Sequence, residues 1–306
     1  MGAEREQNPA CQLCSSREAE PFLKTEEGYS LVRCGNCGVV RLDPIPSDDE
    51  LATQYHGDYY RVPRDRLSRL LDSLIGGFYT RRQARKLEAF EEKGRLLDLG
   101  CGDGRFLAAM EGRGWSASGL DPSEKACEIA QERLKKGTVL NKTLEEAHFP
   151  DASFAAVTLW QVLEHIRNPR EVLLEVRRVL KPGGICLLSV PNIASFDFAL
   201  FRGDWFHLDL PRHLYHYTPE TLRRTVESMG FEVLRVDARS FGCPLSKPHS
   251  LGRWLERRFG PFPLAGKILI VLFLLFYPLF LLWNEVAVVL QKGETFMIVC
   301  KKTEKA

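Results

Sequence analysis

The sequence lacks an excess of charge of either sign, and it lacks repeats. Among its 306 residues, 42 are Lys or Arg and 40 are Asp or Glu, so the formal net charge is +2. A protein that mainly coats nucleic acid is usually more basic than this. No internal repeat or low-complexity tract is visible, 44% of the residues are hydrophobic and 27% are charged. This composition excludes fibrous, collagen-like and mostly disordered chains, and it is typical of a globular protein with a substantial core.

An apolar stretch is also lacking in the first ten residues, MGAEREQNPA, so we expect no secretory signal. Gly2 would suit N-myristoylation, but Glu6 stands where that pattern requires Ser or Thr. We therefore expect a cytoplasmic protein whose cysteines are reduced thiols.

Four of the nine cysteines form two Cys-x-x-Cys pairs near the N-terminus. Cys11 and Cys14 are separated from Cys34 and Cys37 by 19 residues. This is the spacing of a zinc ribbon, in which each pair forms one knuckle and four thiolates make a closed, structural site. The pattern predicts a structural Zn²⁺ in a zinc ribbon at residues 1–45. Five further cysteines are expected to be packing residues: Cys101, Cys127, Cys186, Cys243 and Cys300.

Short apolar runs alternate with helical stretches over residues 94–190. We expect strands at 95–99, 116–120, 154–160 and 185–190, and helices at 105–112, 123–135 and 170–180. Strands that alternate with helices predict an α/β fold, with a parallel sheet covered by helices on both faces. A helix at 219–229 and strands at 231–237 and 295–301 continue the pattern.

The first of these strands runs into a glycine-rich turn and then a helix, in the segment LLDLGCGDGRFL at 96–107. Glycine lets a backbone turn tightly and approach a ligand closely. Asp121 ends the next strand, where a carboxylate can accept both ribose hydroxyls of a nucleoside. A dinucleotide site would have its third glycine one position later. The negative charge of Asp103 would also repel a pyrophosphate, whereas it is compatible with a ligand that carries a sulfonium and an amino group.

The segments LLDLGCGDGRFL, GLDPS, TLEEAHFPDASFAAVTLWQVLEHIRNP and LKPGGICLLSVPN resemble successive motifs of class I S-adenosylmethionine (SAM)-dependent methyltransferases. The resemblance covers residues 94–192 and implies a Rossmann-like fold. It implies a mostly parallel seven-stranded sheet, whose last strand, at 295–301, is antiparallel beside the sixth. The methyltransferase domain would extend over residues 94–303.

The same resemblance implies SAM as cofactor and gives each binding residue a place. The methionine and ribose side would be lined by Asp98, Gly100, Gly102 and Gly104; the ribose would be held by Asp121 with Pro122 beside it; Leu144 and Glu145 would lie at the adenine; Trp160 and Gln161 would face the sulfonium.

The cysteine module followed by LDPIPSDDELATQYHGDYY resembles a bacterial methyltransferase subgroup with an N-terminal zinc-binding module. That subgroup is often linked to sugars, lipid-linked glycans or small secondary metabolites. The layout is also similar to a ribosomal-RNA methyltransferase with an N-terminal zinc ribbon. Residues 46–93 form a basic, helical linker region, whose arginines are either a solvated helix face or a contact with an anionic surface: Arg61, Arg64, Arg66, Arg69, Arg81, Arg82 and Arg85.

Residues 191–217 interrupt the alternation where this fold places acceptor-recognition elements. Within WFHLDLPRHLYHYT, at 205–218, histidine could take the proton of an acceptor hydroxyl as the methyl group arrives. We predict His213 as the general base, with His207 second. The alternative is a lid whose histidines satisfy backbone groups.

Glu164 and His165 follow the fourth strand. Related ubiquinone-biosynthesis O-methyltransferases carry E-x-x-E-H here, a cluster that can hold a divalent metal. Because Gln161 replaces the first glutamate, we expect helix capping or packing for Glu164 and His165 instead of a second metal site.

One apolar segment, ILIVLFLLFYPLFLLWN at 268–284, contains no charged residue. As a helix it would be about 25 Å long, short of a hydrocarbon core of about 30 Å. A single span would also separate the strand at 295–301 from its sheet. We therefore expect residues 251–292 to rest in a membrane interface, with Arg253, Arg257, Arg258 and Lys267 at anionic headgroups. The alternatives are a homodimer interface, a helix that covers the core, and a true span.

The sequence thus predicts a SAM-dependent methyltransferase at the cytoplasmic face of the membrane. Its acceptor would be a small, sugar or lipid-linked molecule, methylated on oxygen in preference to carbon or nitrogen. One alternative is an RNA methyltransferase that grips RNA with the zinc ribbon and the basic linker, although the low net charge disfavours nucleic acid. Another is a non-catalytic, cofactor-binding membrane module.

Overall fold

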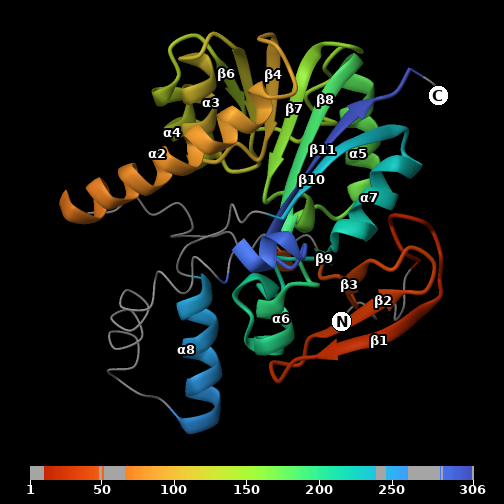
Figure 1. Ribbon diagram of the computed structural model, residues 1–306. Coiled ribbons are helices and arrows are strands. Elements are labelled where there is room, and N and C mark those ends of the chain that lie inside the picture. Colours follow the sequence, from red (N-terminus) through yellow and green to blue (C-terminus); the bar gives the residue numbers. More distant parts are fainter. Residues whose placement is uncertain are drawn as a thin grey trace.

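Two β-sheets organise the chain in the computed structural model (Figure 1). The structure describes residues 10–47, 50–51, 66–238, 246–260, 283 and 285–304, and of residues 66–74 it describes the backbone alone. Apart from Trp283, the expected apolar segment at 268–284 lies outside these ranges, as do Arg61, Arg64, Lys267 and Cys243. No helix within these ranges is long and apolar enough to cross a bilayer.

The larger sheet has seven strands in the order β10-β11-β8-β7-β4-β5-β6. Their bounds are β4 (Arg95–Leu99), β5 (Ser116–Leu120), β6 (Thr138–Leu140), β7 (Phe154–Trp160), β8 (Leu180–Pro191), β10 (Phe231–Asp237) and β11 (Thr295–Lys302). Neighbours from β6 to β8 are parallel, whereas β11 is antiparallel to both β8 and β10. The predicted mostly parallel sheet of seven strands is confirmed. The sequence analysis missed β6, because three residues are too few to show an alternating pattern.

Helices cover both faces of this sheet (Figure 1). Leu96 of β4 and Ile185 of β8 pack in a cluster with α2 and α3, whereas the next residue, Leu97, packs in the cluster that holds α5 and α7. Successive strand residues therefore point to opposite helical layers, as in a doubly wound fold. The helices that flank the sheet are α2 (Arg66–Glu88), α3 (Arg105–Glu111), α4 (Glu124–Arg133), α5 (Pro169–Val179) and α7 (Pro219–Ser228).

The smaller sheet joins the cysteine-containing N-terminus to a distant segment. Its strands are β1 (Ala19–Lys24), β2 (Ser30–Cys34), β3 (Val40–Leu42) and β9 (Tyr215–His216), in that order. Val40 pairs with His216 across the β3–β9 ladder. Just beyond it, the Leu42 amide donates to the Leu214 carbonyl at 2.9 Å. The N-terminal module and the segment at 191–217 thus share one sheet.

The segment at 191–217 begins at the carboxyl end of β8. It contains α6 (Phe196–Phe201), the 3₁₀ turns η3 (Arg202–Asp204) and η4 (Phe206–Leu208), and β9. The outer helix α8 (Ser246–Phe259) contacts it, and the Ser250 hydroxyl accepts a hydrogen bond from the Phe206 amide at 2.9 Å. In open α/β sheets, ligands bind outside the carboxyl ends of the strands. The segment is therefore placed next to the edge where a cofactor is expected.

Candidate cofactor and acceptor site

A glycine turn connects β4 to α3. Gly100, Gly102 and Gly104 have φ angles of 64°, 53° and 74°, in the left-handed region that favours glycine. A Cβ atom on Gly100 would lie 2.5 Å from Cγ2 of Val162, and one on Gly104 would lie 2.7 Å from Cβ of Ala130. Side chains are excluded at both positions, so the backbone itself lines this edge of the sheet.

The side chain of Asp121 is hydrogen-bonded to the glycine turn. Its Oδ2 accepts a hydrogen bond from the Gly102 amide and its Oδ1 accepts one from the Ser123 amide, both at 2.9 Å. The side chain is 3% exposed. The carboxylate that was predicted to hold the ribose thus lies directly against the turn.

Asp98 lies below the turn, near the end of β4, and is 2% exposed. It accepts a hydrogen bond from the Thr158 hydroxyl at 2.5 Å. Burial raises the pKa of Asp98 to about 7; the Thr158 hydrogen bond opposes this shift, and the nearby Asp121 charge adds to it. A cationic ligand group beside it would favour the ionised form.

The remaining predicted cofactor residues follow the ends of neighbouring strands. Pro122 is exposed next to Asp121, and Leu144 is buried beside an exposed Glu145 after β6. Trp160 ends β7, with its ring 5.4 Å from that of Phe106. The sheet thus brings the predicted positions to one edge, although their contacts with a cofactor stay predictions.

Gln161 stands at the position of the first glutamate of the E-x-x-E-H pattern. Its side-chain amide donates to the Ser189 hydroxyl at 3.1 Å. Its φ angle is 58°, so the chain turns sharply after β7.

A family model described as a methyltransferase domain matches residues 64–236, which is more than half of the chain. The chain belongs to this methyltransferase family. Its relatives include the ubiquinone biosynthesis O-methyltransferase of Dechloromonas aromatica (strain RCB). The two are 33% identical over 170 residues, which cover 52% of this chain and 73% of that protein. The enzyme of the same name from Azoarcus sp. (strain BH72) is 31% identical over 170 residues, covering 52% of this chain and 72% of that protein.

Solved methyltransferase structures share the fold. A SAM-dependent methyltransferase from Archaeoglobus fulgidus matches with a TM-score of 0.52 and 21% identity, over 78% of this chain and all of that one. One from Mesorhizobium loti matches with a TM-score of 0.50 and 19% identity, over 74% of this chain and all of that one. Together with the family match, the glycine turn and the two buried aspartates identify a SAM-dependent methyltransferase.

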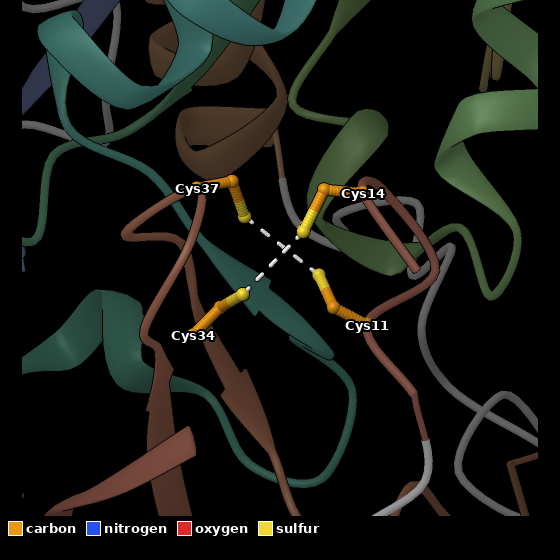
Figure 2. A group of neighbouring side chains, drawn as sticks. All are labelled: Cys11, Cys14, Cys34 and Cys37. Atoms are coloured by element: carbon orange, nitrogen blue, oxygen red, sulfur yellow. Dashed lines mark hydrogen bonds between the residues drawn. The ribbon is translucent and has the colours of Figure 1, made fainter. Parts of the chain in front are cut away.

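The four N-terminal cysteines of this methyltransferase converge on one point (Figure 2). The sulfur atoms are 3.7 Å apart between Cys11 and Cys37, and 3.5 Å apart between Cys14 and Cys34. These distances exceed a disulfide bond of about 2.05 Å. They are close to the edge, about 3.8 Å, of a tetrahedron with Zn–S bonds of about 2.3 Å. The hydrogen bond from Cys37 lowers the pKa of Cys11 to about 5. This donor set fits a structural Zn²⁺, and the ion itself stays a prediction.

The two predicted bases of the methyltransferase lie close together in the 191–217 segment, and both are buried. The Nδ1 of His213 lies 2.8 Å from the carbonyl oxygen of His207. Burial holds the pKa of His213 well below its usual range, and the neighbouring histidines add to the effect. The Nε2 of His213 is 3.7 Å from Asp209, whereas that of His207 is 3.4 Å from Glu294. The proposed base role therefore starts from a neutral His213.

The sequence analysis did not predict which side chains surround Glu164. Glu164 and His165 form η2 (Leu163–His165), and their side chains meet that of His213. Burial raises the pKa of Glu164 to about 8 and lowers that of His165 to about 4. Of the two expected roles, capping or packing, capping by Glu164 is not seen, because no other described residue donates a hydrogen bond to either of its carboxylate oxygens. The E-x-x-E-H pattern of related enzymes pointed to Glu164 and His165, whereas only the recurrence of histidine in 205–218 hinted at His213.

Proposed function

We propose that this methyltransferase transfers the methyl group of SAM to an oxygen atom of a small, sugar or lipid-linked acceptor at a membrane surface. The observation that carries the oxygen assignment is the match to O-methyltransferases at about a third identity, over about half of this chain. The aromatic and histidine-rich segment that begins at the end of β8 offers the acceptor side.

When bound, SAM supplies a methyl carbon on a sulfonium, and attack by the acceptor oxygen breaks the carbon–sulfur bond and leaves a neutral thioether. We assign the ribose hydroxyls to Asp121 and the positively charged methionine end to Asp98. Trp160 and Gln161 would line the reacting centre and keep water out. The acceptor hydroxyl proton would pass to a base, for which His213 and His207 are the candidates. Alignment of the two reactants would be the main contribution of the protein to the rate.

A structural Zn²⁺ at Cys11, Cys14, Cys34 and Cys37 is part of this proposal. The convergence of the four sulfur atoms supports it. A closed four-thiolate site leaves no open coordination position, so its role would be to hold the N-terminal module in shape.

The membrane part of the proposal is supported by exposed apolar side chains, two of which flank residues 261–282 in the sequence. Phe259 at the end of α8 is 74% exposed, Val289 is 79% exposed, and Leu200 at the tip of α6 is 66% exposed. Arg257, expected at a lipid headgroup, instead lies 3.1 Å from Asp204 and 2.8 Å from Glu27. The argument for a membrane contact therefore rests on the apolar side chains.

Flotation with anionic liposomes tests the membrane part. The full chain should float, and a triple variant with Leu274, Leu275 and Leu281 changed to Ser should not. A matched control changes three exposed apolar residues elsewhere, Ile75, Leu174 and Leu234, to Ser and should float. A wild-type chain that stays with the unbound protein overturns the membrane part.

Transfer of labelled methyl groups tests the acceptor class. The label should enter extracted membrane lipids or lipid-linked glycans. Mild base should release the label from a methyl ester and leave it on a methyl ether. Label confined to water-soluble sugars would remove the lipid from the proposal. Label in RNA, with binding that falls steeply as salt rises, would favour the RNA alternative instead.

A further inference from the structure

Three side chains that can bind a metal meet just after β7. Glu164 and His165 come from η2, and His213 comes from the turn before β9. One potential ligand atom of each lies within 4.8 Å of the others. A backbone hydrogen bond of 2.8 Å, from the Leu214 amide to the Glu164 carbonyl, holds the two segments together.

Both imidazole rings are arranged as in metal-ligating histidines. The Nδ1 of His165 lies 3.1 Å from the Arg212 carbonyl oxygen, and that of His213 lies 2.8 Å from the His207 carbonyl oxygen. A carbonyl oxygen only accepts, so each Nδ1 carries the proton and the Nε2 of a neutral ring carries the lone pair. Histidine ligands generally donate their second ring N–H to a carbonyl or carboxylate in this way, which fixes the ring for the metal.

The cluster also contains buried polar atoms whose hydrogen-bonding capacity is unmet. Glu164 is 1% exposed, and none of the other residues that the structure describes donates a hydrogen bond to its carboxylate. His216 is 2% exposed, neither of its ring nitrogens has a hydrogen-bond partner in the described ranges, and its ring centroid is 6.2 Å from that of His213. Buried carboxylates are normally paired or coordinate a metal.

We propose that Glu164, His165 and His213 bind a divalent transition metal, of the zinc class, at a second site separate from the four cysteines. Two imidazoles and one carboxylate are a ligand set that zinc uses, and imidazole ligands disfavour Mg²⁺ and Ca²⁺. The site shares Glu164 and His165 with the E-x-x-E-H pattern but not its first position, because the side chain of Gln161 is hydrogen-bonded to Ser189 and the third ligand comes from the 191–217 segment. Asp209, with Oδ2 3.7 Å from Nε2 of His213, and His216 are the nearest candidates for a fourth ligand.

The proposed metal has a positioning role. It connects the turn after the cofactor strand β7 to the segment that we assign to the acceptor. Glu164 and His213 are 1% and 6% exposed, and His165 is half-buried. A metal bound here occupies the lone pair of His213, so His213 cannot then be the general base, and that role falls to His207.

Counting metal ions in the full-length chain tests this site. Protein stripped under reducing conditions and titrated with Co²⁺ should bind two equivalents. One should give the thiolate-to-cobalt charge-transfer absorption of the cysteine site, and the other should give only the weaker bands of nitrogen and oxygen ligands. Glu164→Gln and His213→Gln should each keep the thiolate signal and bind the second equivalent at least about tenfold more weakly. A Cys34→Ser, Cys37→Ser variant should retain the second equivalent.

His148→Gln is the matched control, because His148 is exposed and lies outside the cluster. It should bind two equivalents like the wild type. SAM binding by each variant checks that it is folded, and the wild-type titration stands without any variant. A wild-type chain that binds one equivalent, all of it with thiolate absorption, overturns the site. Undiminished binding of the second equivalent in folded Glu164→Gln and His213→Gln also overturns it.

Discussion

We predict that Asp98 makes cofactor binding depend on a protonation equilibrium near neutral pH. Its carboxyl group is buried beneath the glycine turn, and this burial raises its pKa to about 7. Below that pH the group is neutral, and above it the group is an anion. A ligand with a sulfonium and an ammonium group interacts favourably with the anion, so its binding must favour loss of the proton.

We predict that the affinity for SAM rises about tenfold between pH 6 and pH 8 and then levels off, because only the ionised fraction of Asp98 binds tightly. Without ligand, the stability of the fold changes with pH in the opposite direction to the affinity for SAM. A raised carboxyl pKa stabilises the fold below its unfolded value near 4, and that stabilisation is lost as pH rises through 7. Calorimetric titration in buffers of different ionisation enthalpy measures both the affinity and the proton released.

Asp98→Asn is the control for this titration. The amide cannot ionise, so the variant should bind SAM more weakly at pH 8, and only the pH dependence of the ligand itself should remain. An affinity that is flat between pH 6 and 8 in the wild type, or an equal slope in the variant, would contradict the role assigned to Asp98.

At the scale of elements, the strand β9 connects the cysteine module to the acceptor segment. It is two residues long, and its pairing with β3 makes the smaller sheet continuous from the N-terminus to residues 214–217. Tyr215 of β9 also donates its hydroxyl hydrogen bond to the Arg167 carbonyl at 3.0 Å, close to η2. The cysteine module is therefore hydrogen-bonded, through β3 and β9, to the segment that carries His213.

Cys34→Ser tests this connection. Loss of the four-thiolate site should loosen β3, so the amides of residues 40–42 and 214–217 should exchange with solvent at least about tenfold faster. SAM affinity should change by less than about threefold, because the glycine turn and Asp121 lie in the other sheet. Hydrogen-exchange mass spectrometry, with SAM binding measured on the same samples, gives both numbers. A substitution is preferable to a chelator here, because a chelator would also remove the metal from the proposed second site.

Unchanged exchange at residues 214–217 in Cys34→Ser would show that β9 holds its place without the metal. A parallel loss of SAM binding would show general unfolding instead of a local effect. Either result contradicts the assigned connection.

The contrast between β4 and β9 shows what could be predicted from the sequence. The strand β4, its glycine turn and Asp121 lie within one short stretch, and each has a local pattern that implies its geometry. The two cysteine pairs were likewise recognisable by spacing alone. By contrast, β9 is too short to show a period, and its partner β3 lies far away in the sequence. The meeting of Glu164 with His213 depends on that same long-range pairing, so no local pattern could predict it.

At the scale of the whole molecule, a buried group of charged side chains joins α8, the acceptor segment and the start of β11. The Lys247 ammonium lies 2.7 Å from Asp197 of α6 and 3.8 Å from Glu294. The other carboxylate oxygen of Glu294 is 3.4 Å from His207. The side chains of Lys247, Asp197 and Glu294 are 12%, 7% and 4% exposed. One lysine thus pairs with two buried carboxylates from parts of the chain that are distant in sequence.

Lys247→Met should therefore destabilise the whole methyltransferase, by about 3–5 kcal/mol, because it leaves two buried carboxylates without their cation. Urea denaturation at pH 7 measures the change. Adding Asp197→Asn should restore part of the loss, because the amide removes one of the two uncompensated charges. Lys125→Met is the matched control, since Lys125 forms an exposed pair with Glu128 at 2.8 Å, and its removal should change stability little. If Lys247→Met is no more destabilising than Lys125→Met, the buried group does not hold these parts together. If Asp197→Asn restores nothing, the loss comes from packing and not from charge.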